Sequence, residues 1–65
     1  MPFIQVTLLE GRSVEQKHAL IRRLTEAVAE EVGGDPQRIR VALYEVSADD
    51  WGIGGVPMSV LRPHG

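Results

Sequence analysis

The chain has 65 residues, of which 43% are hydrophobic and 25% charged, with a formal net charge of -2. This length allows one domain, which we expect to span residues 1–65. The proportion of hydrophobic to charged residues is typical of a folded soluble protein. No basic run indicates nucleic acid as a partner, and neither a signal peptide nor the ~20 apolar residues of a membrane span is present. We therefore expect a cytoplasmic location and no membrane partner.

The small size predicts dependence on other subunits. A chain of this length buries only about 60% of the surface that its unfolded form exposes, and such chains often need disulfides, a metal or partners. There is no cysteine. The two histidines, His18 and His64, are far apart, and neither has metal-ligand spacing, so we interpret both as surface residues. We expect no cofactor and no metal, and oligomerisation is the remaining route to stability.

Residues 3–9 (FIQVTLL) form the first predicted element. They are rich in apolar and β-branched types and lie between Pro2 and Gly11, which predicts a buried strand. Alternation places Ile4, Val6 and Leu8 on one face of that strand.

A long helix is predicted after the turn at residues 10–12. Ser13 and Gln16 have the spacing of a capping box, in which each side chain bonds the backbone of the other residue. Gly33 and Gly34 then end the helix near Val32, and Asp35 followed by Pro36 predicts a short capped turn. Apolar residues at three- and four-residue steps define the predicted inner side: Leu20, Ile21, Leu24, Ala27, Val28 and Val32. Charged residues define the outer side: Lys17, Arg22, Arg23, Glu26 and Glu30.

Residues 39–46 (IRVALYEV) alternate with the period of a second strand. Two strands joined by a helix should run parallel, with the helix on one face of the sheet. The glycines at 52, 54 and 55 predict a tight hairpin in the tail, lying over a neighbouring subunit. The expected fold is α/β (α+β): a single β-α-β unit with two parallel strands, one long helix and a C-terminal β-hairpin, assembling into an oligomer.

Pro2 is the first candidate for chemistry. Removal of Met1 would leave a secondary amine at the chain terminus, beside a strand. An α-amino group has an ordinary pKa near ~7.7 to 8.0, and desolvation or adjacent guanidinium groups lower that pKa, which suits a general base at neutral pH. The alternative is that proline merely permits Met1 removal and begins an edge strand.

Two arginines and one tryptophan are further candidates. Arg12 lies in the turn before the helix and is either an anion-binding group or a solvated residue. Arg40 lies in an apolar strand, where a guanidinium is costly without an anionic partner, whether a ligand or a carboxylate across an interface. Trp51 precedes a glycine-rich segment and is either a pocket wall or an interface anchor. Glu10 and Glu45 receive no catalytic role, because a paired-carboxylate mechanism needs separations that a sequence does not define.

These features together resemble the 4-oxalocrotonate tautomerase family over nearly the whole chain. The resemblance is carried by Pro2, by Arg40, by the segment Leu8-Leu9-Glu10-Gly11-Arg12-Ser13 followed by Glu15-Gln16-Lys17, and by Trp51-Gly52-Ile53-Gly54-Gly55. Two distinctive segments at this separation after Met-Pro make the match specific. Phe3 departs from the small aliphatic residue common after the proline, and Trp51 replaces a frequent phenylalanine.

The resemblance implies an isomerase, a cofactor-independent keto-enol tautomerase of small 2-oxo or 2-hydroxy-dienoate acids. It implies that Pro2 is the base, that Arg12 and Arg40 are catalytic and bind the substrate carboxylate and the 2-oxo or enol oxygen from different subunits, and that Trp51 forms an apolar wall of the substrate site. It further implies a homohexamer built as a trimer of dimers.

Two alternatives stay open at this point. One is a non-enzymatic oligomeric module, favoured by the short chain and an apolar sheet face. The other is a related activity such as 3-haloacrylate hydration or dehalogenation, which by resemblance needs an added carboxylate at the place that Ile53 occupies. If Met1 is retained, the nitrogen of Pro2 is an amide without a basic lone pair, and such a form should be inactive.

Overall fold

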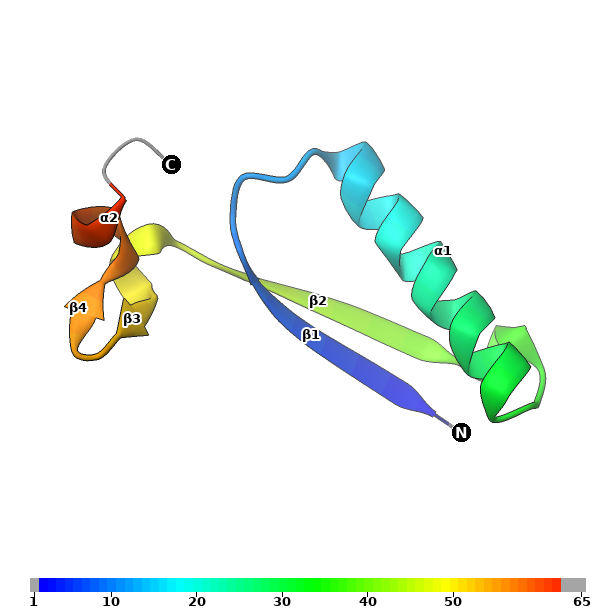
Figure 1. The fold of residues 1–65 in the computed structure, drawn as a ribbon. Coiled ribbons are helices and arrows are strands. Elements are labelled where there is room, and N and C mark those ends of the chain that lie inside the picture. The colour runs from blue at the N-terminus through cyan, green and yellow to red at the C-terminus, as the bar shows by residue number, and fades with distance from the viewer. Residues whose placement is uncertain (1, 63–65) are drawn as a thin grey trace.

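The computed structural model describes residues 2–62, and in that range the chain folds into a β-α-β frame followed by a protruding arm (Figure 1). The frame contains strand β1 (Phe3–Leu9), helix α1 (Val14–Glu31), the 3-10 turn η1 (Pro36–Arg38) and strand β2 (Arg40–Val46). The arm, residues 47–62, contains the 3-10 turn η2 (Ala48–Asp50), the short strands β3 (Gly52–Ile53) and β4 (Val56–Pro57), and helix α2 (Met58–Leu61). His64 lies outside the described residues.

Strands β1 and β2 pair in parallel, as the sequence predicted. Their register runs from Phe3 opposite Arg40 to Leu9 opposite Val46. Two backbone hydrogen bonds extend the ladder at its ends, from the Arg40 amide to the Pro2 carbonyl at 3.1 Å and from the Glu10 amide to the Val46 carbonyl at 2.9 Å. Pro2 is thereby tied to the start of β2 although it precedes β1.

Helix α1 begins where the predicted capping box places it. The Gln16 amide donates to the Ser13 hydroxyl at 3.1 Å, and the Ser13 amide donates to the Gln16 side-chain oxygen at 3.0 Å. After the helix, Gly33 has φ +87, a left-handed conformation that a side chain would strain. Asp35 caps η1 by accepting from the Gln37 amide at 2.9 Å. The predicted boundaries of this segment are confirmed.

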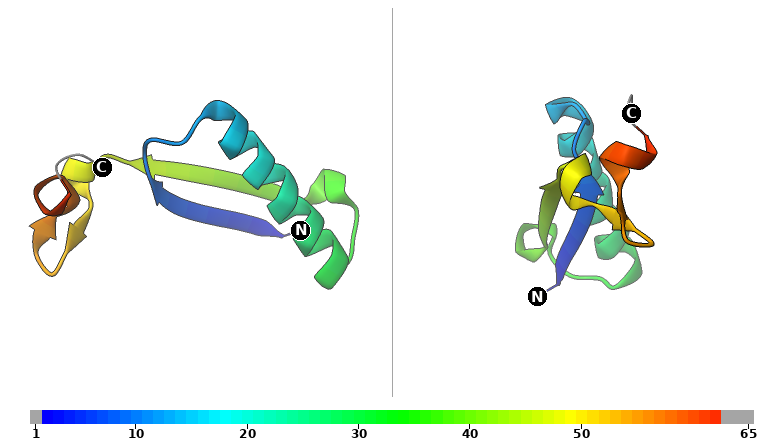
Figure 2. Two further views of the ribbon diagram at one scale, coloured as in Figure 1. Left: turned by 45° about the horizontal axis from the view of Figure 1, so that its top comes forward. Right: turned by 90° about the vertical axis from the view of Figure 1, so that its left-hand side faces the viewer.

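Three side chains in or directly after α1 lie elsewhere than the periodicity predicted. Ala27 is exposed, and Val32, which follows the last helical residue, is 74% exposed. Lys17, predicted on the outer side, is half-buried because its ammonium reaches the Glu45 carboxylate on β2 at 2.7 Å. The helix crosses the sheet obliquely (Figures 1 and 2), so its two ends contact the sheet less evenly than a regular stripe assumes.

The prediction that β1 is a buried strand is wrong for the single chain. Ile4, Val6 and Leu8 share one face as expected, but they are only half-buried. The opposite face, which includes Phe3 at 57% and Tyr44 at 49% exposure, has no covering layer among residues 2–62. The helix covers one face of the sheet, so the other remains open.

The predicted tail hairpin is present. β3 and β4 pair antiparallel around Gly54 and Gly55, both with positive φ, and the Met58 amide donates to the Trp51 carbonyl at 2.7 Å. Met58, at 6% exposure, is the only buried side chain among residues 2–62, and it lies in the arm. Helix α2 and turn η2 were not predicted.

The dimensions indicate a subunit shaped for assembly. The radius of gyration is 14.9 Å, and the principal extents are 43 × 24 × 14 Å, whereas a compact domain of 65 residues has a radius of about 11 Å. The accessible surface is 5069 Å², against about 4,100 Å² for a compact monomer of this mass. The excess surface agrees with the expectation that further copies complete the core.

Candidate active site

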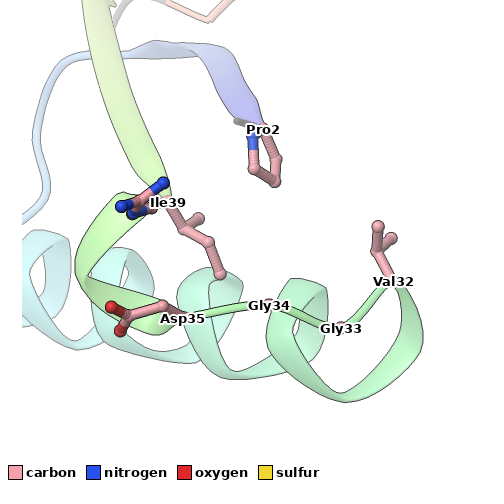
Figure 3. Close-up of a pocket in the computed structure, with 7 residues that line it drawn as sticks. Pro2, Val32, Gly33, Gly34, Asp35 and Ile39 are labelled. Carbon is pink, nitrogen blue, oxygen red and sulfur yellow. The ribbon is translucent and has the colours of Figure 1, made fainter.

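Pro2 lies at the amino end of β1, beside an open cleft of about 450 Å³. That volume is within the range of about 300–1,000 Å³ usual for small-molecule sites. Figure 3 shows the Pro2 ring facing the segment from Val32 to Asp35, with Ile39 beside it. The complete lining is Pro2, Val32, Gly33, Gly34, Asp35, Arg38 and Ile39. The cleft therefore combines apolar and glycine surface with one cation and one carboxylate.

Arg40 is joined to Pro2 through the backbone but does not line this cleft. Its amide donates to the Pro2 carbonyl, and its guanidinium Nη1 donates to the Arg38 carbonyl at 3.4 Å. Because Phe3 and Arg40 are register partners, their side chains project on the sheet face opposite to α1. The Arg40 side chain is exposed on that face.

Arg12 lies at the other end of the sheet. It follows the carboxyl end of β1, where Gly11 turns the chain with φ +122 and the Arg12 guanidinium donates to the Leu9 carbonyl at 3.3 Å. A seven-residue strand separates Arg12 from Pro2, a length of roughly 23 Å at the usual rise. Arg12 and Pro2 of one chain are thus too far apart to contact one small substrate.

Trp51 also lies beyond that far end, because β2 runs parallel to β1 and the arm begins after Val46. The ring is half-buried, within a segment held by the hydrogen bond between the Met58 amide and the Trp51 carbonyl. Ile53, the position where the alternative haloacrylate chemistry needs a carboxylate, is an apolar residue at 52% exposure in β3.

The candidate residues therefore lie at opposite ends of one sheet, in two groups that we refer to as candidate half-sites. The amino-end group comprises Pro2, Arg38 and Arg40, and the carboxyl-end group comprises Arg12 and Trp51. Of the four candidates from the sequence, Pro2 and Arg40 are joined by a backbone hydrogen bond within one chain, whereas Arg12 lies a strand length away from Pro2.

Arg38 is the lining residue that sequence reasoning missed. It directly follows Pro36-Gln37 in an exposed turn, and a charged residue in such a place is usually solvated. The signal that could have identified it is the parallel topology, which brings the start of the second strand beside the start of the first.

The remaining ionisable candidates behave as surface groups. His18 is exposed, as predicted, and Glu45 is paired with Lys17. Within residues 2–62 no group of three or more His, Cys, Asp or Glu side chains could hold a metal ion. No helix in that range is both long and apolar enough to cross a membrane.

Comparison with known proteins gives one consistent family. The sequence family described as "Tautomerase enzyme" matches residues 2–61. A 2-hydroxymuconate tautomerase of Comamonas testosteroni is 48% identical over 56 residues, which cover 86% of this chain and 89% of that protein.

Solved structures agree with this. A 4-oxalocrotonate tautomerase isozyme of Methylibium petroleiphilum superposes with a TM-score of 0.87 at 45% identity, covering 92% of this chain and 97% of the other. A heterohexameric 4-oxalocrotonate tautomerase of Chloroflexus aurantiacus superposes with a TM-score of 0.89 at 39% identity, covering 95% and 100%. The β-α-β arrangement with a hairpin is therefore a shared fold.

Proposed function

This chain belongs to the tautomerase family and is an isomerase of that kind, and from that premise we propose that Pro2, freed by removal of Met1, is its general base. The supporting observation is the cleft beside Pro2, whose lining combines apolar and glycine surface with the Arg38 guanidinium and the Asp35 carboxylate. Desolvation and a nearby cation both lower the pKa of an ammonium group, and a general base acts through the unprotonated amine.

The proposed reaction converts the enol or dienol form of a small 2-hydroxy acid into its 2-oxo form. The Pro2 amine takes the proton of the enol hydroxyl, the carbon-oxygen bond becomes a carbonyl, and the Pro2 ammonium returns a proton to carbon. Atoms and charges balance without a cofactor. Arg12 and Arg40, which come from different copies, hold the substrate carboxylate and the oxygen on which charge develops.

We further propose that the working unit is a homohexamer, a trimer of dimers, acting as one domain per chain in the cytoplasm. The support is the separation of the two half-sites by the length of β1 together with the excess accessible surface of the single chain. The Chloroflexus relative is a heterohexamer. In such an assembly Trp51 of a neighbouring copy would close the apolar side of the Pro2 cleft.

The base is tested by following ketonisation of 2-hydroxymuconate and phenylenolpyruvate. We expect the Pro2→Ala protein to lose about 10²-fold or more in kcat/KM, the usual contribution of a positioned general base, although a flexible primary amine remains. Arg40→Ala and Arg12→Ala should each lower turnover of both acids. Equal rates for the normal and Pro2→Ala proteins would remove Pro2 as the base.

Sharing of the site is tested by mixing inactive chains. Pro2→Ala and Arg12→Ala chains are each weakly active alone, but after unfolding and joint refolding some sites combine an intact Pro2 with an intact Arg12 from another copy. Activity should then rise well above the sum of the two separate proteins. Pro2→Ala chains that are unfolded and refolded alone are the control. No gain of activity in the mixture of the two variants would contradict a shared site.

A further inference from the structure

We propose that Lys17 is a positioning residue for Arg12: by holding the Glu45 carboxylate in an ion pair, it keeps the Arg12 guanidinium available to the substrate. The inference rests on the proposed function, in which Arg12 binds an anionic oxygen of the substrate in a neighbouring copy. The observation that carries it is the contact of Lys17 Nζ with Glu45 Oε1 at 2.7 Å, which joins α1 to β2.

The ion pair lies beside the turn that carries Arg12. On the helix side, the Lys17 amide donates at 3.1 Å to the carbonyl of Ser13, the residue after Arg12. On the sheet side, the Glu10 amide donates at 2.9 Å to the carbonyl of the residue that follows Glu45. Backbone hydrogen bonds therefore tie both ends of the turn to the neighbourhood of the pair, and Arg12 and Glu45 lie at the same end of the sheet.

Arg12 has no carboxylate partner in the part of the chain that the structure describes. Neither ion pair within residues 2–62 includes it. Its guanidinium donates instead to the uncharged Leu9 carbonyl at 3.3 Å, and the residue is exposed. A guanidinium in this state keeps most of its N–H donors for a ligand, and an anion binds it without first displacing a carboxylate.

Glu45 is the carboxylate whose availability depends on Lys17. Glu10 and Glu15 are also close to Arg12 in the sequence, but neither forms an ion pair with it within residues 2–62. The Glu45 charge is already taken up by Lys17, and loss of Lys17 would release it at the end of the sheet where Arg12 lies. A released carboxylate would occupy the guanidinium for part of the time, and the apparent affinity for substrate falls by the fraction of Arg12 that stays free.

A mechanical brace between α1 and β2 would behave differently from this electrostatic role. A brace is lost to the same extent when either partner is removed. In the electrostatic role, Lys17 matters only while Glu45 carries its charge. Loss of Lys17 is then harmful, whereas loss of Glu45, or of both residues together, is harmless.

The test measures kcat and KM for 2-hydroxymuconate and the calorimetric Kd of muconate, which has no enol hydroxyl, with the processed protein. We expect Lys17→Met to raise KM and Kd about three- to fivefold, the upper range for one partly exposed ion pair, with kcat nearly unchanged. Glu45→Gln alone should leave KM and Kd unchanged. The double variant Lys17→Met/Glu45→Gln should regain the normal values of both constants.

Arg22→Met is the matched control. It removes one positive charge from the same helix and leaves Glu26 unpaired, more than two turns beyond Lys17, so KM and Kd should stay unchanged. Lys17→Arg keeps the charge and should preserve both constants. Size-exclusion chromatography checks assembly, and Lys17→Gln replaces Lys17→Met if the methionine variant does not assemble.

The outcomes separate this inference from the proposed function. In an Arg12→Ala background, Lys17→Met should have no further effect on Kd. No loss for Lys17→Met, equal losses for Lys17→Met and Glu45→Gln, or no rescue in the double variant would overturn the inference and leave the role of Arg12 intact. Unchanged KM and Kd for Arg12→Ala alone would overturn both. Since muconate binding involves no proton transfer, failure of Pro2 as the base does not affect this test.

Discussion

The frame and the arm differ in how their structures are determined. In the frame, each boundary has a local cause: a capping box at Ser13, a left-handed glycine at Gly33 and a capped turn at Asp35. The arm packs chiefly on itself, around Met58, and extends beyond the sheet (Figure 1). The difference teaches that local signals define the elements of the frame but leave one face of its sheet open, whereas the arm is held by packing around one buried side chain.

The largest effect should come from the arm's buried residue. Met58→Ala removes the only buried side chain of residues 2–62, and truncations of this kind cost about 2–5 kcal/mol. The expected result is a lower urea midpoint together with loss of the assembled species. Val14→Ala, at the exposed start of α1, is the control and should change stability by less than ~1 kcal/mol. An unchanged midpoint for Met58→Ala would mean that the arm is not a packed unit.

The next largest loss of stability is expected at two turn glycines, one in the arm and one in the frame. Gly55 in the arm has φ +84 and Gly33 in the frame has φ +87, with open space around both. A side chain costs about 1–2 kcal/mol in that conformation. Alanine at either position should lower the free energy of unfolding by a similar amount, but only Gly55→Ala should also weaken assembly, as measured by dissociation on dilution. Identical effects on assembly would remove the distinction between frame and arm.

The capping box should contribute about 1 kcal/mol to the frame. Ser13→Ala leaves the Gln16 amide without its acceptor, and circular dichroism during urea unfolding measures the loss. Ser59→Ala is the matched control, because its hydroxyl bonds the exposed Asp49 side chain in the arm. A larger loss in the control than in Ser13→Ala would contradict this account of the frame.

The smallest effect should come from the pair between Lys17 and Glu45. The Lys17 Nζ atom lies 2.7 Å from Glu45 Oε1 and so joins α1 to β2, but the two side chains remain 23% and 32% exposed. Pairs at such exposed sites contribute about 0.2–1 kcal/mol to the free energy of unfolding. A double-mutant cycle with Lys17→Ala and Glu45→Ala should give a coupling energy in that range, decreasing with added salt. A coupling that does not respond to salt would indicate a packing contact instead.

Sequence reasoning succeeded where the causes are local and failed where they depend on neighbours. The strand alternation, the capping box and the hairpin glycines each specify a conformation over a few residues, and all are confirmed. The helical pattern predicts Lys17 on the outer side because the residue is charged. Its partner, Glu45, is 28 residues away in the sequence, so the local pattern does not reveal the contact. Arg38 was missed for the same reason, since only the parallel pairing of β1 and β2 brings it beside Pro2. The roles of Pro2, Arg12, Arg40 and Trp51 stay predictions, because one chain contains only parts of the site.

The central claim is that a free secondary amine at Pro2 performs the chemistry, and the most direct measurement relates activity to the chain terminus. Preparations with different fractions of retained Met1, quantified by intact mass, are assayed for ketonisation of 2-hydroxymuconate. The account predicts a rate per subunit that rises in proportion to the fraction lacking Met1 and extrapolates to zero when all chains retain it. A protein that keeps Met1 on every chain and still turns over at the full rate would contradict it.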